Sequence, residues 1–145
     1  MKRLTGTALL LCLALVLPSV WAAKITLKIG RQAVHAEIAN TPQSREHGLM
    51  QRDHLCSNCG MLFVFERADR YKFWMKDTSL PLSIAFIAAD GSILNTAEMQ
   101  PNTVDTHGAQ GDALYALEMN RNWFARNGIK PDDKVLGLEH APKAR

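Results

Sequence analysis

The sequence predicts a mainly β fold: a single compact domain built as a closed or partly open β-barrel of complex topology, with two short helices. Three observations support this prediction. Short apolar segments, about seven or eight in number, recur between clusters of turn-forming residues. Helix-start and helix-stop signals occur together at only two places. A chain of 145 residues, without any change of composition along residues 23–145, suffices for one hydrophobic core.

Residues 1–22 have the three parts of a secretory signal peptide: basic Lys2 and Arg3, the apolar run 4–17, and small residues before a cut after Ala22. An uncleaved membrane anchor is the alternative, but the apolar run is shorter than the roughly 20 residues that cross a bilayer. Lipidation at Cys12 is not expected, because Leu11 precedes it. We therefore expect residues 23–145 to be the mature protein, in the periplasm or secreted.

The formal net charge is +3, to which Lys2 and Arg3 contribute two, so the mature chain would carry +1. Such a balance predicts neither a nucleic-acid partner nor, after signal cleavage, a membrane partner.

The first elements follow from alternation and turn chemistry. Apolar side chains alternate along 24–29 and 34–38, and Gly30 between them predicts a tight antiparallel hairpin. Thr41 before a proline predicts a helix start, and Gly48 predicts its end after about two turns.

The middle of the chain predicts consecutive strands. Segment 60–65 is a short buried strand by composition, and 66–70 is a charged reversal. Segment 71–75 favours β structure. Segment 82–88 is almost wholly apolar, as expected for a strand covered on both faces, and a turn at Asp90-Gly91 leads to the next strand.

The last third begins with residues 101–111, which lack apolar periodicity and are predicted to be the longest loop and the most mobile element. A strand at 113–119 follows. We expect a helix carrying Trp123 and Phe124, capped by Asn120 or Asn122 and ended by Gly128, then a strand at 135–138 and a loose tail from Glu139.

Several of these segments, in this order, resemble the blocks of the bacterial and archaeal family called domain of unknown function 192. They are Thr41-Pro42 through Gly48-Leu49-Met50, Gly60 through Phe65, Phe73 through Thr78 with Pro81-Leu82, Phe86-Ile87 with Asp90-Gly91, and Tyr115 through Glu118 with Gly128-Ile129-Lys130. The resemblance implies one compact, usually exported domain on a closed β-barrel, and it implies no activity. Two departures stand out: Ser83 occupies a commonly acidic position, and Cys56 to Cys59 is an insert.

Cys56 and Cys59 are predicted to form a structural disulfide in an oxidising compartment. Redox catalysis is less favoured, because a strand rather than a helix follows the pair and the helix field that lowers a thiol pKa is missing. A copper or zinc site using His47, His54, Cys56 and Cys59 is the other alternative, although a second ordered ligand pair is absent.

The polar candidates for a ligand-binding site are Lys76, Asp77, Thr78 and Glu118, because each lies in or at the end of a hydrophobic strand, where a charge must be paired or solvated. One interpretation is a structural ion pair between Lys76 and Glu118. The other is the mouth of a small pocket covered by 101–111.

Phe73, Trp74 and Trp123 would supply the apolar walls of that pocket, although core packing explains them as well. The sequence predicts no catalytic residue and no cofactor; hydrolysis at Asp77 or Glu118 lacks a recognisable acid and base pair.

The sequence therefore favours a non-catalytic, monomeric, exported binding or accessory domain for a small polar ligand or an envelope protein. The alternative is a metal-binding or thiol-redox protein that uses the Cys-x-x-Cys segment.

Overall fold

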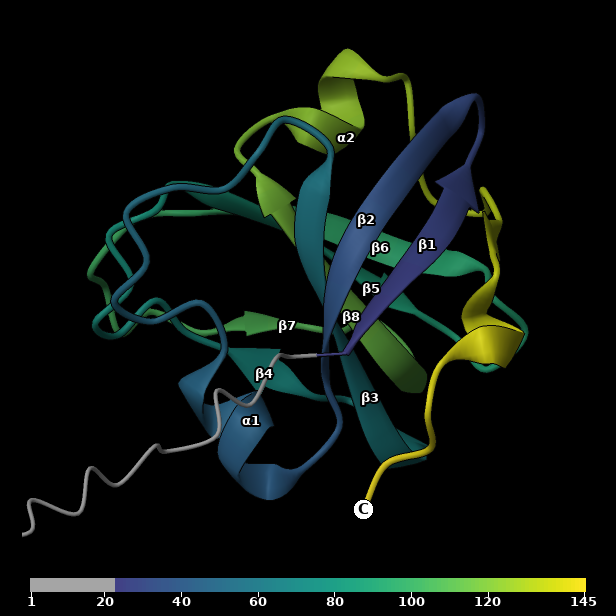
Figure 1. Ribbon diagram of the computed structural model, residues 1–145, viewed down its shortest axis with the longest axis horizontal. Helices are drawn as coiled ribbons and strands as arrows, with labels where there is room; N and C mark the ends of the chain where they lie inside the picture. Colours follow the sequence, from purple (N-terminus) through teal and green to yellow (C-terminus); the bar gives the residue numbers. More distant parts are fainter. Residues whose placement is uncertain (1–22) are drawn as a thin grey trace, which may run out of the picture.

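The computed structural model describes residues 23–145, so the expected signal peptide at 1–22 lies outside the described residues. The fold is mainly β, as predicted. A seven-stranded sheet in the order β6-β5-β8-β3-β2-β1-β9 curls into a half-barrel, and β4 pairs with β7 in a separate two-stranded sheet (Figure 1). The strands are β1 (Lys24–Ile29), β2 (Gln32–Ala39), β3 (Cys59–Asp69), β4 (Lys72–Phe73), β5 (Leu82–Ile87), β6 (Ile93–Met99), β7 (His107–Gly108), β8 (Ala113–Asn120) and β9 (Val135–Leu136).

The predicted first hairpin is present: β1 and β2 pair antiparallel from Lys24↔Glu37 to Ile29↔Gln32. Gly30 turns the chain with φ +57°, a conformation that costs glycine little. β2 and β3 are parallel neighbours, and a parallel pair requires a crossover connection. Helix α1 (Pro42–His47) and the segment that follows it form that connection.

Local signals define both ends of α1, as predicted. Thr41 accepts a hydrogen bond from the Ser44 amide, and the Ser44 hydroxyl in turn accepts from the Thr41 amide. Gly48, with φ +49°, ends the helix. None of its six residues is buried, so α1 is held by the contacts of individual side chains rather than by an apolar face.

Four expectations from the sequence were wrong, because contacts with residues distant in the sequence determine the structure of the segments concerned. β3 does not end at Phe65 but continues to Asp69 through an irregularity in its pairing with β8, and its charged end stays in solvent. The 101–111 segment contains β7, and it is fixed by Asn95, whose side chain donates to the Gly108 carbonyl and accepts from the Gln110 amide.

The other two concern the C-terminal part. Asn122 precedes helix α2 (Trp123–Arg126) but makes no side-chain cap, and its backbone amide donates to the Ser83 hydroxyl instead. The tail is not loose: a short 3-10 helix spans Leu138–His140, and the Arg145 amide donates to the Asn40 carbonyl at 2.8 Å.

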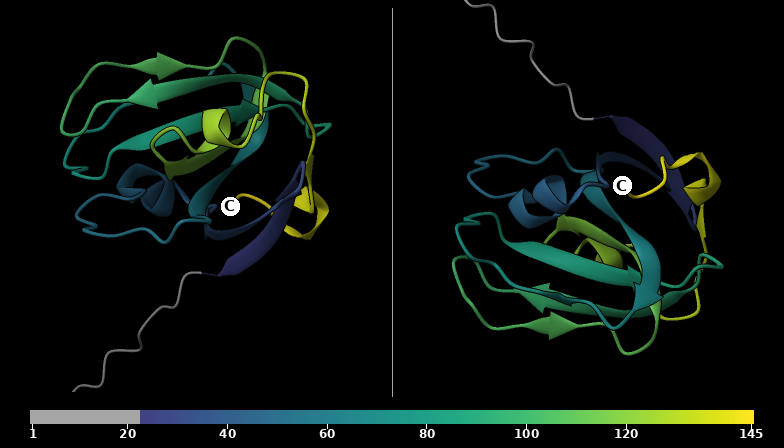
Figure 2. Two further views of the ribbon diagram at one scale, coloured as in Figure 1. Left: turned by 90° about the horizontal axis from the view of Figure 1, so that it is seen from above. Right: turned by 90° about the horizontal axis from the view of Figure 1, so that it is seen from below.

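The central strands β3, β5 and β8 have two buried faces, and alternate residues belong to different cores. β5 is buried at all six positions, as predicted for a strand covered on both sides. On one face the sheet curls back through β2, β1 and β9 over α2, as the end-on views in Figure 2 show. On the other face lie the residues after α1 and the β4 and β7 sheet.

We name the two cores by these faces. The inner core lies within the curl of the sheet and includes Leu27, Ile29, Val34, Leu62, Val64, Ala85, Ile87, Leu117, Met119, Trp123 and Phe124. The outer core lies on the opposite face and includes Leu49, Met61, Phe63, Met75, Leu82, Ile84, Phe86, Met99 and Ala116.

Candidate functional site

A cavity of about 260 Å³ opens between α1 and β4 on the outer-core side of the sheet. In Figure 1, α1 lies directly below β4. The lining residues come from α1 and the turn after it, from β3, from the segment around β4, and from β8. They are Arg45, Glu46, His47, Gly48, Leu49, Met50, Phe63, Phe65, Tyr71, Lys72, Phe73, Trp74, Thr78 and Glu118.

Aromatic side chains make up much of the wall. Phe65 and Tyr71 stack with ring centroids 3.6 Å apart, and Phe63 meets Phe73 edge to face at 4.8 Å. Trp74 lies at the rim, where 48% of the residue is exposed. The sequence analysis identified Phe73 and Trp74 as wall candidates and missed Phe63, Phe65 and Tyr71, although the aromatic density of 63–74 was the signal for them.

Arg45 fastens α1 over this aromatic wall. Its guanidinium donates to the Val64 carbonyl at 3.0 Å and lies 5.8 Å from the centroid of the Phe65 ring. The helix therefore forms one side of the cavity without contributing a buried residue of its own.

Glu118 is the polar group at the buried end of the cavity. On β8 it lies opposite Met61 of β3 and Ile84 of β5, so its side chain shares the outer-core face with theirs. Only 4% of the residue is exposed. Burial raises the pKa of the Glu118 carboxyl to about 8, because the low-dielectric surroundings disfavour the charged form. The carboxyl group is therefore mostly protonated at pH 7.

Glu118 differs from the other buried polar side chains of residues 23–145. Those side chains, Thr78, Ser83 and Asn95, all form hydrogen bonds, whereas that of Glu118 bonds to no described residue. No described side-chain oxygen or nitrogen is both fully enclosed and without a partner, so the Glu118 carboxyl oxygens touch the open space of the cavity. A carboxyl group in such surroundings costs stability unless a molecule in the cavity bonds to it.

Thr78 is held at the cavity by the segment that we expected to cover the site. The Thr78 hydroxyl donates to the Lys76 carbonyl at 3.0 Å, and its own carbonyl accepts from the Asn102 amide. The Met75 amide donates to the Thr103 carbonyl beside it. None of residues 101–111 lines the cavity, so the expectation that this segment covers the site is wrong. The segment instead holds Met75 and Thr78 in place through backbone hydrogen bonds.

The four ligand-binding candidates divide into two pairs. Thr78 and Glu118 line the cavity, whereas Lys76 and Asp77 line a shallower neighbouring hollow. The two depressions share Glu46, His47, Met50 and Trp74.

The expected ion pair between Lys76 and Glu118 is not formed among the described residues. The ammonium of Lys76 lies 5.8 Å from the Trp74 ring centroid, in an exposed position. Trp123 is also not a wall of the cavity: it lies in the inner core, and its Nε1 donates to the Asn58 side chain at 3.0 Å.

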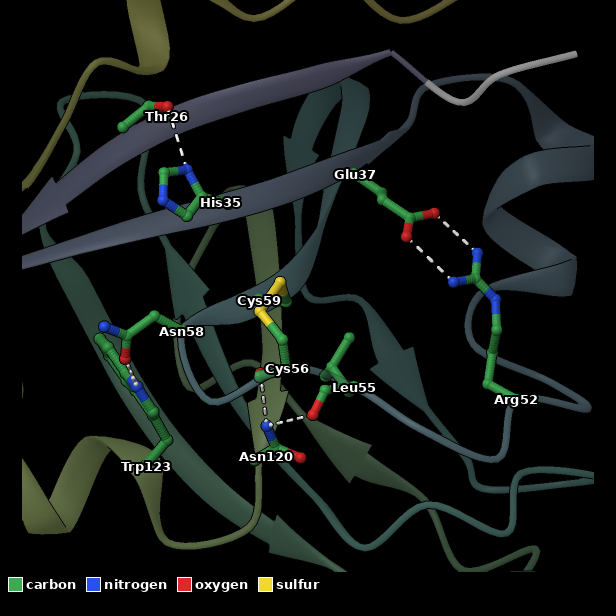
Figure 3. The surroundings of a disulfide bond; sticks show 10 residues. All are labelled: Thr26, His35, Glu37, Arg52, Leu55, Cys56, Asn58, Cys59, Asn120 and Trp123. Atoms are coloured by element: carbon green, nitrogen blue, oxygen red, sulfur yellow. Dashed lines mark hydrogen bonds and ion pairs between the residues drawn. A yellow bond between two sulfur atoms is a disulfide. The ribbon is translucent and has the colours of Figure 1, made fainter.

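Cys56 and Cys59 form a disulfide at the start of β3 (Figure 3). Asn120 from β8 donates to the Leu55 and Cys56 carbonyls, at 3.2 and 2.9 Å, and so ties this loop to the sheet. The structure brings no three His, Cys, Asp or Glu side chains of residues 23–145 into an arrangement that could hold a metal ion.

Ser83 lies in the sheet beside a carboxylate from the next strand. Its hydroxyl is 2.7 Å from both carboxylate oxygens of Glu98, its cross-strand neighbour on β6. The serine and the glutamate also accept the Asn122 amide, at 2.8 and 3.1 Å, so they fix the approach to α2.

These features define a class: a small half-barrel domain with one aromatic cavity that ends on a buried acid. Among the described residues, no helix is long and apolar enough to be a membrane span. The chain belongs to the family DUF192, described as uncharacterized ACR, whose model matches residues 24–137. The family predicted from the sequence is thereby confirmed.

The solved structures that are similar to this chain include the following two, whereas no curated protein matches it. A protein from Sinorhizobium meliloti 1021, named a candidate transcription regulator, is 32% identical with a TM-score of 0.78, and the match covers 82% of this chain and 97% of that one. A protein of unknown function from Novosphingobium aromaticivorans DSM 12444 is 34% identical with a TM-score of 0.71, covering 79% and 84%.

Proposed function

We propose that this protein is a non-catalytic, exported binding domain that takes a small ligand in the cavity between α1 and β4. The observation that carries the proposal is the Glu118 carboxyl, which is buried, touches the cavity and bonds to no described residue. A ligand atom that hydrogen-bonds or pairs with this group would remove the cost of leaving it unsatisfied.

The size and lining of the cavity favour a small molecule over a protein partner. A volume of about 260 Å³ is just below the usual range of small-molecule pockets, and aromatic walls around a buried polar group are typical of such sites. Two of the polar side chains that line the cavity are buried. Thr78 already donates its hydroxyl to a backbone carbonyl, which leaves the Glu118 carboxyl as the buried group that can specify the ligand.

Export is the second part of the proposal. The disulfide between Cys56 and Cys59 supports an oxidising compartment, and the residues 1–22 have the pattern of a signal peptide. Intact mass of the protein purified from the periplasm or medium tests it: we expect a chain that begins near Ala23 and is two hydrogens lighter than its reduced form. A full-length or reduced chain would contradict export.

A thermal-shift screen of a broad metabolite panel tests the binding function. A ligand at a hundred times its Kd stabilises the folded state by about 2.7 kcal/mol, which corresponds to several degrees in Tm. Glu118→Leu should abolish the shift, and the control Glu139→Gln, an exposed glutamate outside the cavity, should preserve it. The absence of any response in the wild-type protein would count against a small ligand and favour an envelope protein.

A further inference from the structure

We propose that the ligand carries an alkylated ammonium group, which lies among the aromatic rings of the cavity with its positive charge against the Glu118 carboxyl. This inference rests on the proposed binding function and names the chemical class of the ligand.

The first argument is the combination of an aromatic wall with a single buried acid, Glu118. Phe63, Phe65, Tyr71, Phe73 and Trp74 all line one cavity, and the faces of such rings attract cations. The protein's own cations already use two of these rings, since Arg45 lies over Phe65 and Lys76 over Trp74, each 5.8 Å from the ring centroid. A carboxyl group at the buried end then supplies the countercharge.

The second argument concerns hydrogen bonds and favours an alkylated group over a primary ammonium. A primary ammonium brings three N–H donors, each of which needs an acceptor when buried. The carboxyl of Glu118 is the one buried polar side chain of the described residues without a hydrogen bond to another described residue. A quaternary ammonium needs no acceptor, and its methyl groups contact aromatic walls favourably.

The remaining charges of the cavity shape the other end of the ligand. Arg45, Glu46 and His47 come from α1, and Lys72 comes from β4; Glu46 and Lys72 are exposed. The two positive side chains of this set, Arg45 and Lys72, outnumber its one carboxylate, Glu46. An anionic group on the outer end of the ligand is therefore favourable there. We therefore expect a small zwitterion to bind more tightly than a simple cation.

Matched pairs of probes test the inference by calorimetry on the mature protein. Choline is compared with 3,3-dimethylbutan-1-ol, and glycine betaine with 3,3-dimethylbutyrate; each pair has the same shape, and only the first member has a positive charge. We expect each ammonium compound to bind at least tenfold more tightly than its carbon analogue, with Glu118→Gln reducing this preference at least tenfold. Trp74→Leu, at an exposed position on the rim, should weaken binding of the ammonium compounds more than binding of the analogues.

A proton count gives a second readout. Because the free carboxyl of Glu118 is mostly protonated at pH 7, a cation that binds against the ionised form should release close to one proton, measured in two buffers of different ionisation enthalpy. Glu118→Gln should abolish the release, and the control Glu139→Gln should leave it unchanged.

The outcomes separate the two proposals. Equal or tighter binding of the carbon analogues, or no binding of either pair, would overturn the ammonium assignment. If another compound of the metabolite panel still shifts the Tm in a Glu118-dependent manner, the proposed binding function stands, although the ammonium assignment does not. If no compound does so, the binding function itself fails.

Discussion

The inner and outer cores are built on the same three strands, yet they differ in kind. Along β8, Leu117 enters the inner core and its neighbour Glu118 enters the outer one. On the inner face the buried polar side chain is Ser83, whose hydroxyl is fully engaged with Glu98 and the Asn122 amide. On the outer face a carboxyl group is buried without a partner among the described residues, beside a cavity. The comparison teaches that the polar group on one face is fully bonded within the fold, whereas the polar group on the other face is buried at a cavity, where we propose that a ligand binds.

The largest expected effect comes from the inner core. Leu117→Ala removes a fully buried side chain and leaves a cavity, so we expect a loss of about 2–5 kcal/mol in the free energy of unfolding, measured by urea denaturation. The exposed Leu136→Ala, as control, should change it by less than about 0.5 kcal/mol. Loss of ligand affinity in a folded Leu117→Ala protein would show that the two faces are not independent.

The buried Glu118 carboxyl on the outer-core face should make the stability of the protein depend on pH. Its folded pKa of about 8 lies above the value of 4.5 for an unperturbed glutamate, so the folded state holds the proton more tightly. Stability therefore falls as pH rises from about 4.5 to about 8. At about 1.36 kcal/mol per unit, the whole effect is at most about 5 kcal/mol, and water in the cavity reduces it.

Glu118→Gln should remove this pH dependence. The stability of the variant relative to the wild-type protein should therefore increase as pH rises, and the variant should be the more stable of the two above pH 8. Denaturation curves at several pH values measure it, with Glu139→Gln as control. A wild-type protein whose stability is flat between pH 5 and 8 would mean that the carboxyl is solvated or paired.

The disulfide sharpens the comparison because Cys59 packs against the outer core, while the loop that the disulfide closes is tied to the inner core. Cys56 and Cys59 bracket Asn58, which accepts from Trp123, and none of the three lines the outer cavity. Replacing both cysteines by alanine should lower stability by about 2 kcal/mol, as chain-entropy arguments give for so short a loop. Ligand affinity should be unchanged. A protein that loses binding while it keeps its Tm would place the cysteines in the function instead.

The smallest expected effect is at the ion pair between Arg52 and Glu37, whose side chains meet at 2.6 and 2.9 Å. Hydrogen bonding from Arg52 lowers the pKa of Glu37, so the contribution of the pair is complete above about pH 4.5 and is lost as pH falls through the lowered pKa. Because Arg52 is more than a third exposed, a double-mutant cycle with Arg52→Met and Glu37→Gln should give only about 1 kcal/mol, decreasing with salt. A larger, salt-independent coupling would contradict this.

The sequence could predict what depends on neighbouring residues. The alternation of apolar side chains predicted the first hairpin, and Thr41 and Gly48 predicted the ends of α1. The continuous apolar run at 82–88 predicted a strand buried on both faces. These features follow from side-chain period, capping and glycine geometry, all of which act over a few residues. The resemblance to DUF192 also came from such local blocks.

Only the tertiary structure decided which distant residues meet. Lys76 and Glu118 both follow hydrophobic segments, and nothing local distinguished a pair from two separate groups. The strand order brought Glu118 between Met61 and Ile84, while Lys76 stayed in solvent beside Trp74. In the same way, the crossover placed α1 over the aromatic residues of β3 and β4 and so made the cavity. Strand order and crossover path are long-range properties of the whole chain, which is why the pattern of single segments did not reveal the site.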